Sequence, residues 1–200
     1  MGLQTALAAS ALALLSGVAS AQITFTSTGS VSFTQTFNPD GGVFASGAYT
    51  AGDLGFFTAD TDGRFSLTYL GQESSYDDGV RIVVNGMTLH ESDAIGSWIT
   101  GPMTMGSLLD FTFFASGGED VSNGLPSAGH SSFALLGRDV TTSAGTFAYV
   151  VGYNDGYHHD DWDDYVIGIN PLAVPEPSSV AMLLAGFGVM GFALRRRLLG

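Results

Sequence analysis

The chain has 200 residues, no cysteine, and 6 basic against 19 acidic side chains, which gives a formal net charge of −13. This balance excludes a typical nucleic-acid-binding protein, because phosphate binding depends on clustered Lys and Arg. The absence of cysteine excludes a disulfide framework and a thiolate metal site. The length fits one domain with accessory segments, and the 28 glycines with many Thr, Ser and aromatic residues favour β-structure.

The first 21 residues have the pattern of a signal peptide. An apolar stretch from Ala6 to Leu15 precedes Ala19-Ser20-Ala21, a small-x-small site of the kind that signal peptidase cuts. We therefore predict export by signal peptidase and the secretion machinery, with Ala19 and Ala21 marking the cleavage site and Gln22 starting the mature chain. The first residues carry no Lys or Arg, which leaves open an upstream start codon. The alternative is a structural helix rich in Ala and Leu.

Residues 22–172 show alternating apolar and polar positions between turn residues. Ile23 and Phe25 alternate with threonines, and Asn85-Gly86 stands between two apolar runs, which is a strong hairpin pattern. Further short strands are predicted from the stretches 64–70, 108–115, 132–137, 146–153 and 165–169. Because no part of this region has helical periodicity, the sequence predicts one all-β domain, an antiparallel β-sandwich or jelly-roll-like fold.

An acidic run follows the stretch 146–153. It contains five aspartates, which are Asp155, Asp160, Asp161, Asp163 and Asp164. These carboxylates repel one another unless a cation neutralises them, and Ca²⁺ takes six to eight oxygen ligands. The sequence therefore predicts either a calcium site formed by these aspartates or a solvated acidic loop whose repulsion is screened by salt. Tyr165, Ile167 and Ile169 are expected to fix the loop to the core.

The C-terminal end combines a proline motif, an apolar stretch and a basic cluster. Pro175-Glu176-Pro177 is expected to be extended, because proline disfavours helix at the residue before it. The apolar stretch 178–194 is long enough for a short membrane helix, and Arg195, Arg196 and Arg197 follow it directly. Basic residues beside a span stay in the cytoplasm, so the domain is expected on the other side of the inner membrane. The alternative is a buried core helix.

These three parts, in this order, resemble the PEP-CTERM sorting signal, which we assign to residues 173–200. The resemblance implies that an exosortase recognises Pro175, Glu176 and Pro177 and removes the tail, and that Arg195–Arg197 retain it. It also implies a Gram-negative bacterium that makes extracellular polysaccharide and biofilm. The stretches 63–86 and 149–169 resemble domains that often accompany this signal, which implies an extracellular β-sandwich.

We therefore predict a membrane-anchored precursor that reaches the cell surface or extracellular matrix and has a structural or adhesive role, with polysaccharide as a partner. One alternative is a carbohydrate-binding module, which would require Trp98, Tyr157 and Trp162 to form one exposed aromatic platform. A secreted hydrolase is less favoured, because the chain contains no G-x-S-x-G nucleophile motif. We predict that the protein is not an enzyme.

Overall fold

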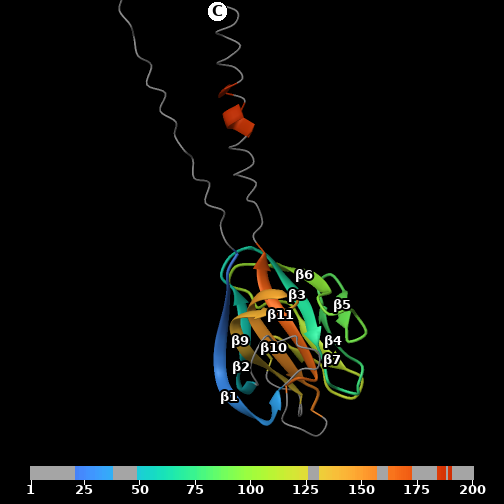
Figure 1. Ribbon diagram of the computed structural model, residues 1–200. Coiled ribbons are helices and arrows are strands. Elements are labelled where there is room, and N and C mark those ends of the chain that lie inside the picture. The colour runs from blue at the N-terminus through green and yellow to red at the C-terminus, as the bar shows by residue number, and fades with distance from the viewer. Residues whose placement is uncertain are drawn as a thin grey trace, which may run out of the picture. The chain divides into compact units, whose positions relative to one another are not determined.

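The computed structural model (Figure 1) describes residues 21–37, 49–125, 131–156, 162–172, 184–187 and 189–190. The β-structure lies within one compact unit, Ser20–Val174. The predicted signal peptide lies outside the described residues except for Ala21, which is buried in the core of this unit.

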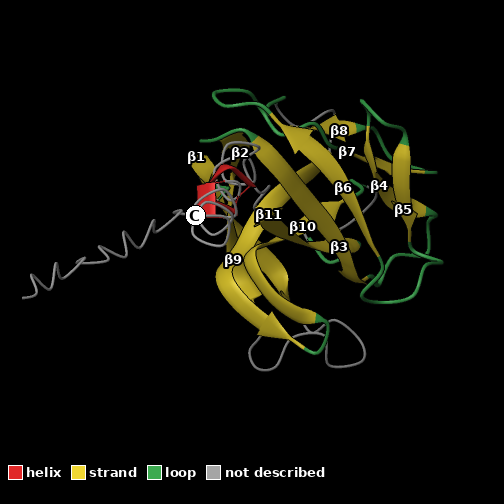
Figure 2. Cartoon of the chain, turned by 90° about the horizontal axis from the view of Figure 1, so that it is seen from above, coloured by secondary structure: helices red, strands yellow, loops and turns green. Residues whose placement is uncertain are grey.

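In the described part of the chain, eleven strands form two antiparallel sheets. The large sheet has the order β1 (Ile23–Phe37), β2 (Tyr49–Ala59), β9 (Ser132–Thr142), β10 (Gly145–Asn154), β11 (Tyr165–Leu172), β3 (Gly63–Gly71) and β6 (Trp98–Met103). The small sheet has the order β5 (Met87–His90), β4 (Asp78–Ile82), β7 (Thr112–Ala115) and β8 (Val121–Ser122). Figure 2 shows the small sheet on one side of the large one. The all-β prediction is confirmed.

The main core lies between the two sheets and is rich in aromatic rings. Phe113 of β7 stacks on Tyr153 of β10 with ring centroids 5.0 Å apart and planes 2° apart. Tyr165, Ile167 and Ile169 of β11 are all buried in this core, as their alternation predicted. Strand β11 begins directly after the acidic run, and these three side chains anchor one of its faces between the sheets.

Strand β1 changes its alternation at a bulge. Ile23 and Phe25 are buried and Thr24 between them is exposed. The pairing with β2 then shifts between Ser27 and Gly29, and Val31 packs against a different apolar cluster. Because an extra residue reverses the faces of a strand, the bulge separates two apolar sets that look continuous in the sequence.

A second apolar cluster covers the opposite face of the large sheet. Its buried members are Leu70, Ala134, Leu136, Phe147, Val150, Trp162 and Val166. Val140 and Ala144, from the β9–β10 hairpin, pack against it. The central strands of the large sheet are therefore buried on both faces, which explains why β11 is apolar at consecutive positions.

Specific hydrogen bonds hold two of the turns, and the first of these turns matches the Asn85-Gly86 pattern. The β4–β5 hairpin closes through Gly86, whose φ is 67° and whose N–H donates to the carbonyl oxygen of Ile82 at 2.9 Å. In the β2–β3 turn, Asp62 Oδ1 accepts from the N–H of Met105 at 2.8 Å. Asp60 Oδ2 accepts from the Thr24 hydroxyl at 2.7 Å. These carboxylates fix neighbouring segments of the fold.

Candidate functional site

Several strand ends and loops meet at one end of the sandwich. The end of β3 pairs with the start of β11 through Gly71 and Val166, and the end of β10 pairs with the start of β11 through Tyr153 and Tyr165. The β3–β4 loop joins them, because the N–H of Glu73 donates to the carbonyl oxygen of Asp163 at 3.1 Å. We call this region the acidic end and define it by Ser74, Asp78, Glu91, Asp155 and Asp164.

The structure describes three of the five predicted calcium ligands. Asp155 and Asp164 are buried, and the N–H of Asp155 donates to Asp164 Oδ2 at 2.8 Å. Asp163 is half-buried, and Asp160 and Asp161 lie outside the described residues. Among the described residues, no three Asp, Glu or His side chains are arranged to hold a metal ion. Calcium binding by the five aspartates therefore stays a prediction.

Asp155 connects the β3–β4 loop to the segment before β9. Its Oδ2 accepts from the Ser74 hydroxyl at 3.1 Å, and its carbonyl oxygen accepts from the Ser131 hydroxyl at 2.7 Å. Ser131 Oγ in turn accepts from the N–H of Glu119 at 3.1 Å. These side-chain and backbone contacts hold Asp155 in one position, so its carboxylate is preorganised.

Asp78, the first residue of β4, was not predicted to belong to a site. Its side chain is 0% exposed, and neither Oδ1 nor Oδ2 has a hydrogen-bond partner. Its backbone is paired with Glu91: the N–H of Asp78 donates to Glu91 Oε2 at 3.4 Å, and its carbonyl oxygen accepts from the N–H of Glu91 at 3.1 Å. The sequence offers a weak hint, Asp77-Asp78-Gly79 at the start of an apolar strand, but adjacent acidic residues usually lie in solvent.

The electrostatic environment of Asp78 is unfavourable to its charge. Burial is the main reason that its pKa is raised from 3.8 to about 8, and the Asp155 carboxylate raises it further. Ser74 partly offsets the rise, whereas Glu91 and Asp77 add to it. Burial also raises the pKa of Tyr69 to about 12, with contributions from Glu91, Asp93 and Asp78. The acidic end therefore holds clustered negative charge in a desolvated setting.

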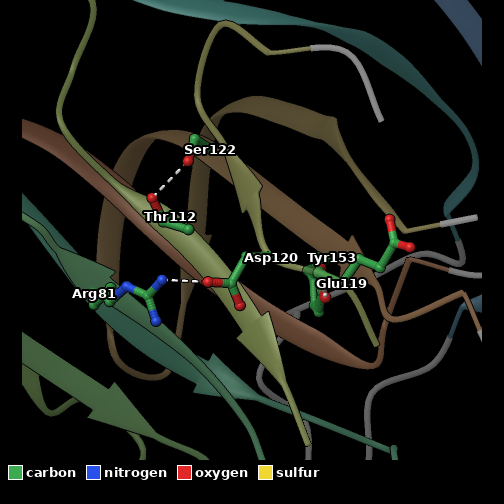
Figure 3. Close-up of polar contacts among 6 residues, drawn as sticks. All are labelled: Arg81, Thr112, Glu119, Asp120, Ser122 and Tyr153. Carbon is green, nitrogen blue, oxygen red and sulfur yellow. Dashed lines mark hydrogen bonds and ion pairs between the residues drawn. The ribbon is translucent and has the colours of Figure 1, made fainter. Parts of the chain in front are cut away.

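The three arginines of the domain make their contacts elsewhere. Figure 3 shows Arg81 in an ion pair with Asp120, while the Glu119 carboxylate points away from that pair. Arg64 donates to the Thr100 hydroxyl, and Arg138 lies over the rings of Phe25 and Tyr149. All the charged groups that shift the pKa of Asp78 are carboxylates.

The residues of the proposed aromatic platform are not all on the surface. Trp98 is 63% exposed at the start of β6, whereas Trp162 is 5% exposed and belongs to the second apolar cluster. The Trp162 Nε1–H donates to the Ser132 hydroxyl at 3.1 Å. Tyr157 lies outside the described residues. Trp162 is therefore a packing residue, and it cannot form an exposed platform with Trp98.

The C-terminal segment is described only in part. Residues 184–187 and 189–190 are helical, and the apolar side chains Leu184, Phe187, Val189 and Met190 are exposed. Pro175, Glu176, Pro177 and Arg195–Arg197 lie outside the described residues. None of the described helices has the length and apolar character needed to span a membrane.

Comparison with known proteins identifies the C-terminal segment. The family model of the PEP-CTERM protein-sorting motif matches residues 173–197. Searches of curated proteins and of solved structures found no match to the chain.

Proposed function

We propose that this chain, which carries a PEP-CTERM sorting motif at residues 173–197, is a structural or adhesive protein of the bacterial envelope or extracellular polysaccharide matrix. The motif implies an exported protein that an exosortase processes at its C-terminus. In this proposal the apolar stretch 178–194 anchors the precursor in the inner membrane, and the β-sandwich reaches the surface or matrix after processing.

The composition of the tail supports the anchoring step. Leu184, Phe187, Val189 and Met190 expose large apolar side chains on helical residues, which is favourable in lipid and unfavourable in water. Arg195–Arg197 follow, and such a cluster stays on the cytoplasmic side of a membrane. The domain would then face the periplasm, where an exosortase could cut the extended segment before the helix.

The packing of the domain supports a structural role. Its core is buried between two sheets, and a second cluster covers the far face of the large sheet. Two depressions beside β2 and β9 have volumes of about 250 and 170 Å³, smaller than typical ligand pockets. The sorting motif at residues 173–197, joined to this extensively packed β-sandwich, is the observation that carries the proposal.

The alternatives are less well supported. A carbohydrate-binding module needs an aromatic platform, and Trp162 is buried as a member of the second apolar cluster. A glycoside hydrolase, the type of hydrolase that an acidic site would suit, needs a carboxyl group that reaches its substrate. Asp78 has the raised pKa of a general acid, but its side chain is 0% exposed.

The experiment that tests the proposal follows the mass of the exported protein. The full chain is expressed in a bacterium with an exosortase and in the same strain without the enzyme. We expect a shorter mature protein, cut near Pro175–Pro177, only where exosortase is present. Alanine substitution of Pro175, Glu176 and Pro177 together should block the cut.

Pro171→Ala is a matched control, because Pro171 lies in β11 and outside the matched motif. This variant should be processed normally. Equal processing with and without exosortase would reject the sorting step. A processed protein that neither pellets with cells nor binds secreted polysaccharide would reject the structural or adhesive role.

A further inference from the structure

We propose that Asp78 and Asp155 bind a divalent cation, of which Ca²⁺ fits best, inside the acidic end of the sandwich. This site differs from the five-aspartate site expected from the sequence, because it is centred on the first residue of β4 rather than on the loop before β11. The proposal is independent of the sorting function.

The first argument is the burial of Asp78 without partners. Its side chain is 0% exposed, and both carboxylate oxygens lack a hydrogen-bond donor. A buried carboxylate is costly unless it is paired or coordinates a metal. Strand β4 pairs on both sides, with β5 and β7, so Asp78 cannot turn outward without disturbing the small sheet.

The second argument is the position of Asp155. It exerts the strongest charge effect on Asp78, and the two residues share Ser74 as a neighbour. A serine hydroxyl has a single hydrogen to donate, and that of Ser74 is directed to Asp155 Oδ2. This hydroxyl therefore offsets the raised pKa of Asp78 only in part, and the combined charge of the two carboxylates matches that of a divalent cation.

The third argument is the supply of further oxygen ligands. Gln72 Oε1 and the Tyr165 hydroxyl are also buried without partners. Gln72 stands two residues before Ser74, and the charge of Asp78 contributes to the raised pKa of Tyr165. Two carboxylates with neutral amide and hydroxyl oxygens form a set that Ca²⁺ accepts, because its coordination is flexible and oxygen-based. Mg²⁺ requires stricter octahedral geometry and should bind more weakly.

The competing occupant is a proton. A proton on Asp78 would remove its charge, and the raised pKa makes this possible near neutral pH. A cation and a proton compete for the same oxygens, so only a direct binding measurement separates the two.

The test is calorimetric titration of the full chain, in detergent and at pH 8, with CaCl₂ and separately with MgCl₂. Thermal melting with Ca²⁺ and with EDTA provides a second readout. We expect saturable Ca²⁺ binding, a melting midpoint that is higher with Ca²⁺ than with EDTA, and weaker binding of Mg²⁺.

Asp78→Asn keeps the size of the side chain and removes its charge, so it should fold and lose at least tenfold in Ca²⁺ affinity. The matched control is the double variant Asp160→Asn/Asp161→Asn, which neutralises part of the sequence-predicted run and should bind as the parent chain does. Near-UV circular dichroism checks folding, and Asp78→Ser replaces Asp78→Asn if the latter does not fold, because it also removes the charge and leaves the five-aspartate run intact.

Two results would overturn the proposal. One is the absence of Ca²⁺ binding by the parent chain, which would mean that a proton and not a cation neutralises the Asp78 carboxyl group. The other is full Ca²⁺ affinity in Asp78→Asn, and a loss of affinity in the Asp160/Asp161 variant would then place calcium in the loop. A loss of Ca²⁺ affinity in both variants would support Asp78 as a ligand. It would also show that Asp160 or Asp161 contributes to binding at the same site.

Discussion

The side-chain amide of Asn123 pairs with the backbone of Phe57 as a neighbouring strand would. The N–H of Phe57 donates to Asn123 Oδ1 at 2.8 Å, and Asn123 Nδ2 donates to the carbonyl oxygen of Phe57 at 2.8 Å. The second amide hydrogen reaches the carbonyl oxygen of Leu109 at 2.9 Å. Because Phe57 lies in β2 and Asn123 directly follows β8, one buried side chain connects the large sheet to the small one.

Replacing this amide should destabilise the domain strongly. Asn123→Ala removes three buried hydrogen bonds and leaves the N–H of Phe57 without its acceptor, while the carbonyl oxygens of Phe57 and Leu109 each keep one backbone donor. We expect a loss of about 3 kcal/mol in the free energy of unfolding. Urea denaturation of the purified chain measures the loss. Asn85→Ala is the control, because both hydrogen bonds of the Asn85 side chain, from the N–H of Met87 and to the carbonyl oxygen of Thr100, are exposed. Its loss should cost less than about 1 kcal/mol. Equal losses in the two variants would show that the amide does not connect the sheets.

Gly152 allows the segment before β11 to cross β10 at close range. A Cβ atom at this position would lie 1.8 Å from the carbonyl oxygen of Trp162. Gly152→Ala should therefore displace Trp162 from the second apolar cluster and cost about 3 kcal/mol or more. We expect a change in tryptophan fluorescence together with a lower melting midpoint.

Gly29→Ala is the matched control, because a Cβ there would meet nothing within 4 Å. It lies in β1 and is exposed, so its stability should change by less than about 0.5 kcal/mol. A Gly152→Ala variant as stable as Gly29→Ala would contradict the close crossing.

The raised pKa of Asp78 gives a pH dependence with a defined sign. The folded chain keeps the proton up to about pH 8, whereas the unfolded chain releases it near pH 4. Stability should therefore fall as the pH rises between these values. The groups that face Asp78 are Asp77, which directly precedes β4, together with Glu91, Asp155 and the Ser74 hydroxyl, and the three carboxylates reinforce the effect.

The measurement is urea denaturation of the parent chain and of Asp78→Asn, both in EDTA. At pH 8 the variant should be more stable by several kcal/mol, because each pKa unit corresponds to about 1.4 kcal/mol. The difference should shrink towards pH 5. A difference that is constant with pH would mean that the Asp78 carboxyl does not titrate in this window.

The two tryptophans should respond differently to substitution. Trp98 is 63% exposed, so Trp98→Ala should leave the melting midpoint almost unchanged, whereas Trp162→Ala should lower it because Trp162 is buried. The same pair tests the carbohydrate alternative. Binding of secreted polysaccharide that disappears in Trp98→Ala would favour a carbohydrate-binding module over a structural role.

The sequence determined the local features of this protein. Ile23 and Phe25 are buried, the Asn85-Gly86 hairpin forms, and Tyr165, Ile167 and Ile169 face the main core. The sorting motif at 173–197 is also a contiguous pattern, and the family model confirms it. These features depend on neighbouring residues, on the twofold alternation of a strand and on turn chemistry, so they can be recognised without knowing the fold.

Only the tertiary structure decided which distant groups meet. Asp78 is an ordinary acidic residue in the sequence, and its burial follows from the pairing of β4 with both β5 and β7. Trp162 could equally have been exposed, but the close crossing at Gly152 places it on the far face of the large sheet. Burial and charge coupling arise from segments far apart in the chain, and strand alternation carries no information about which segments those are.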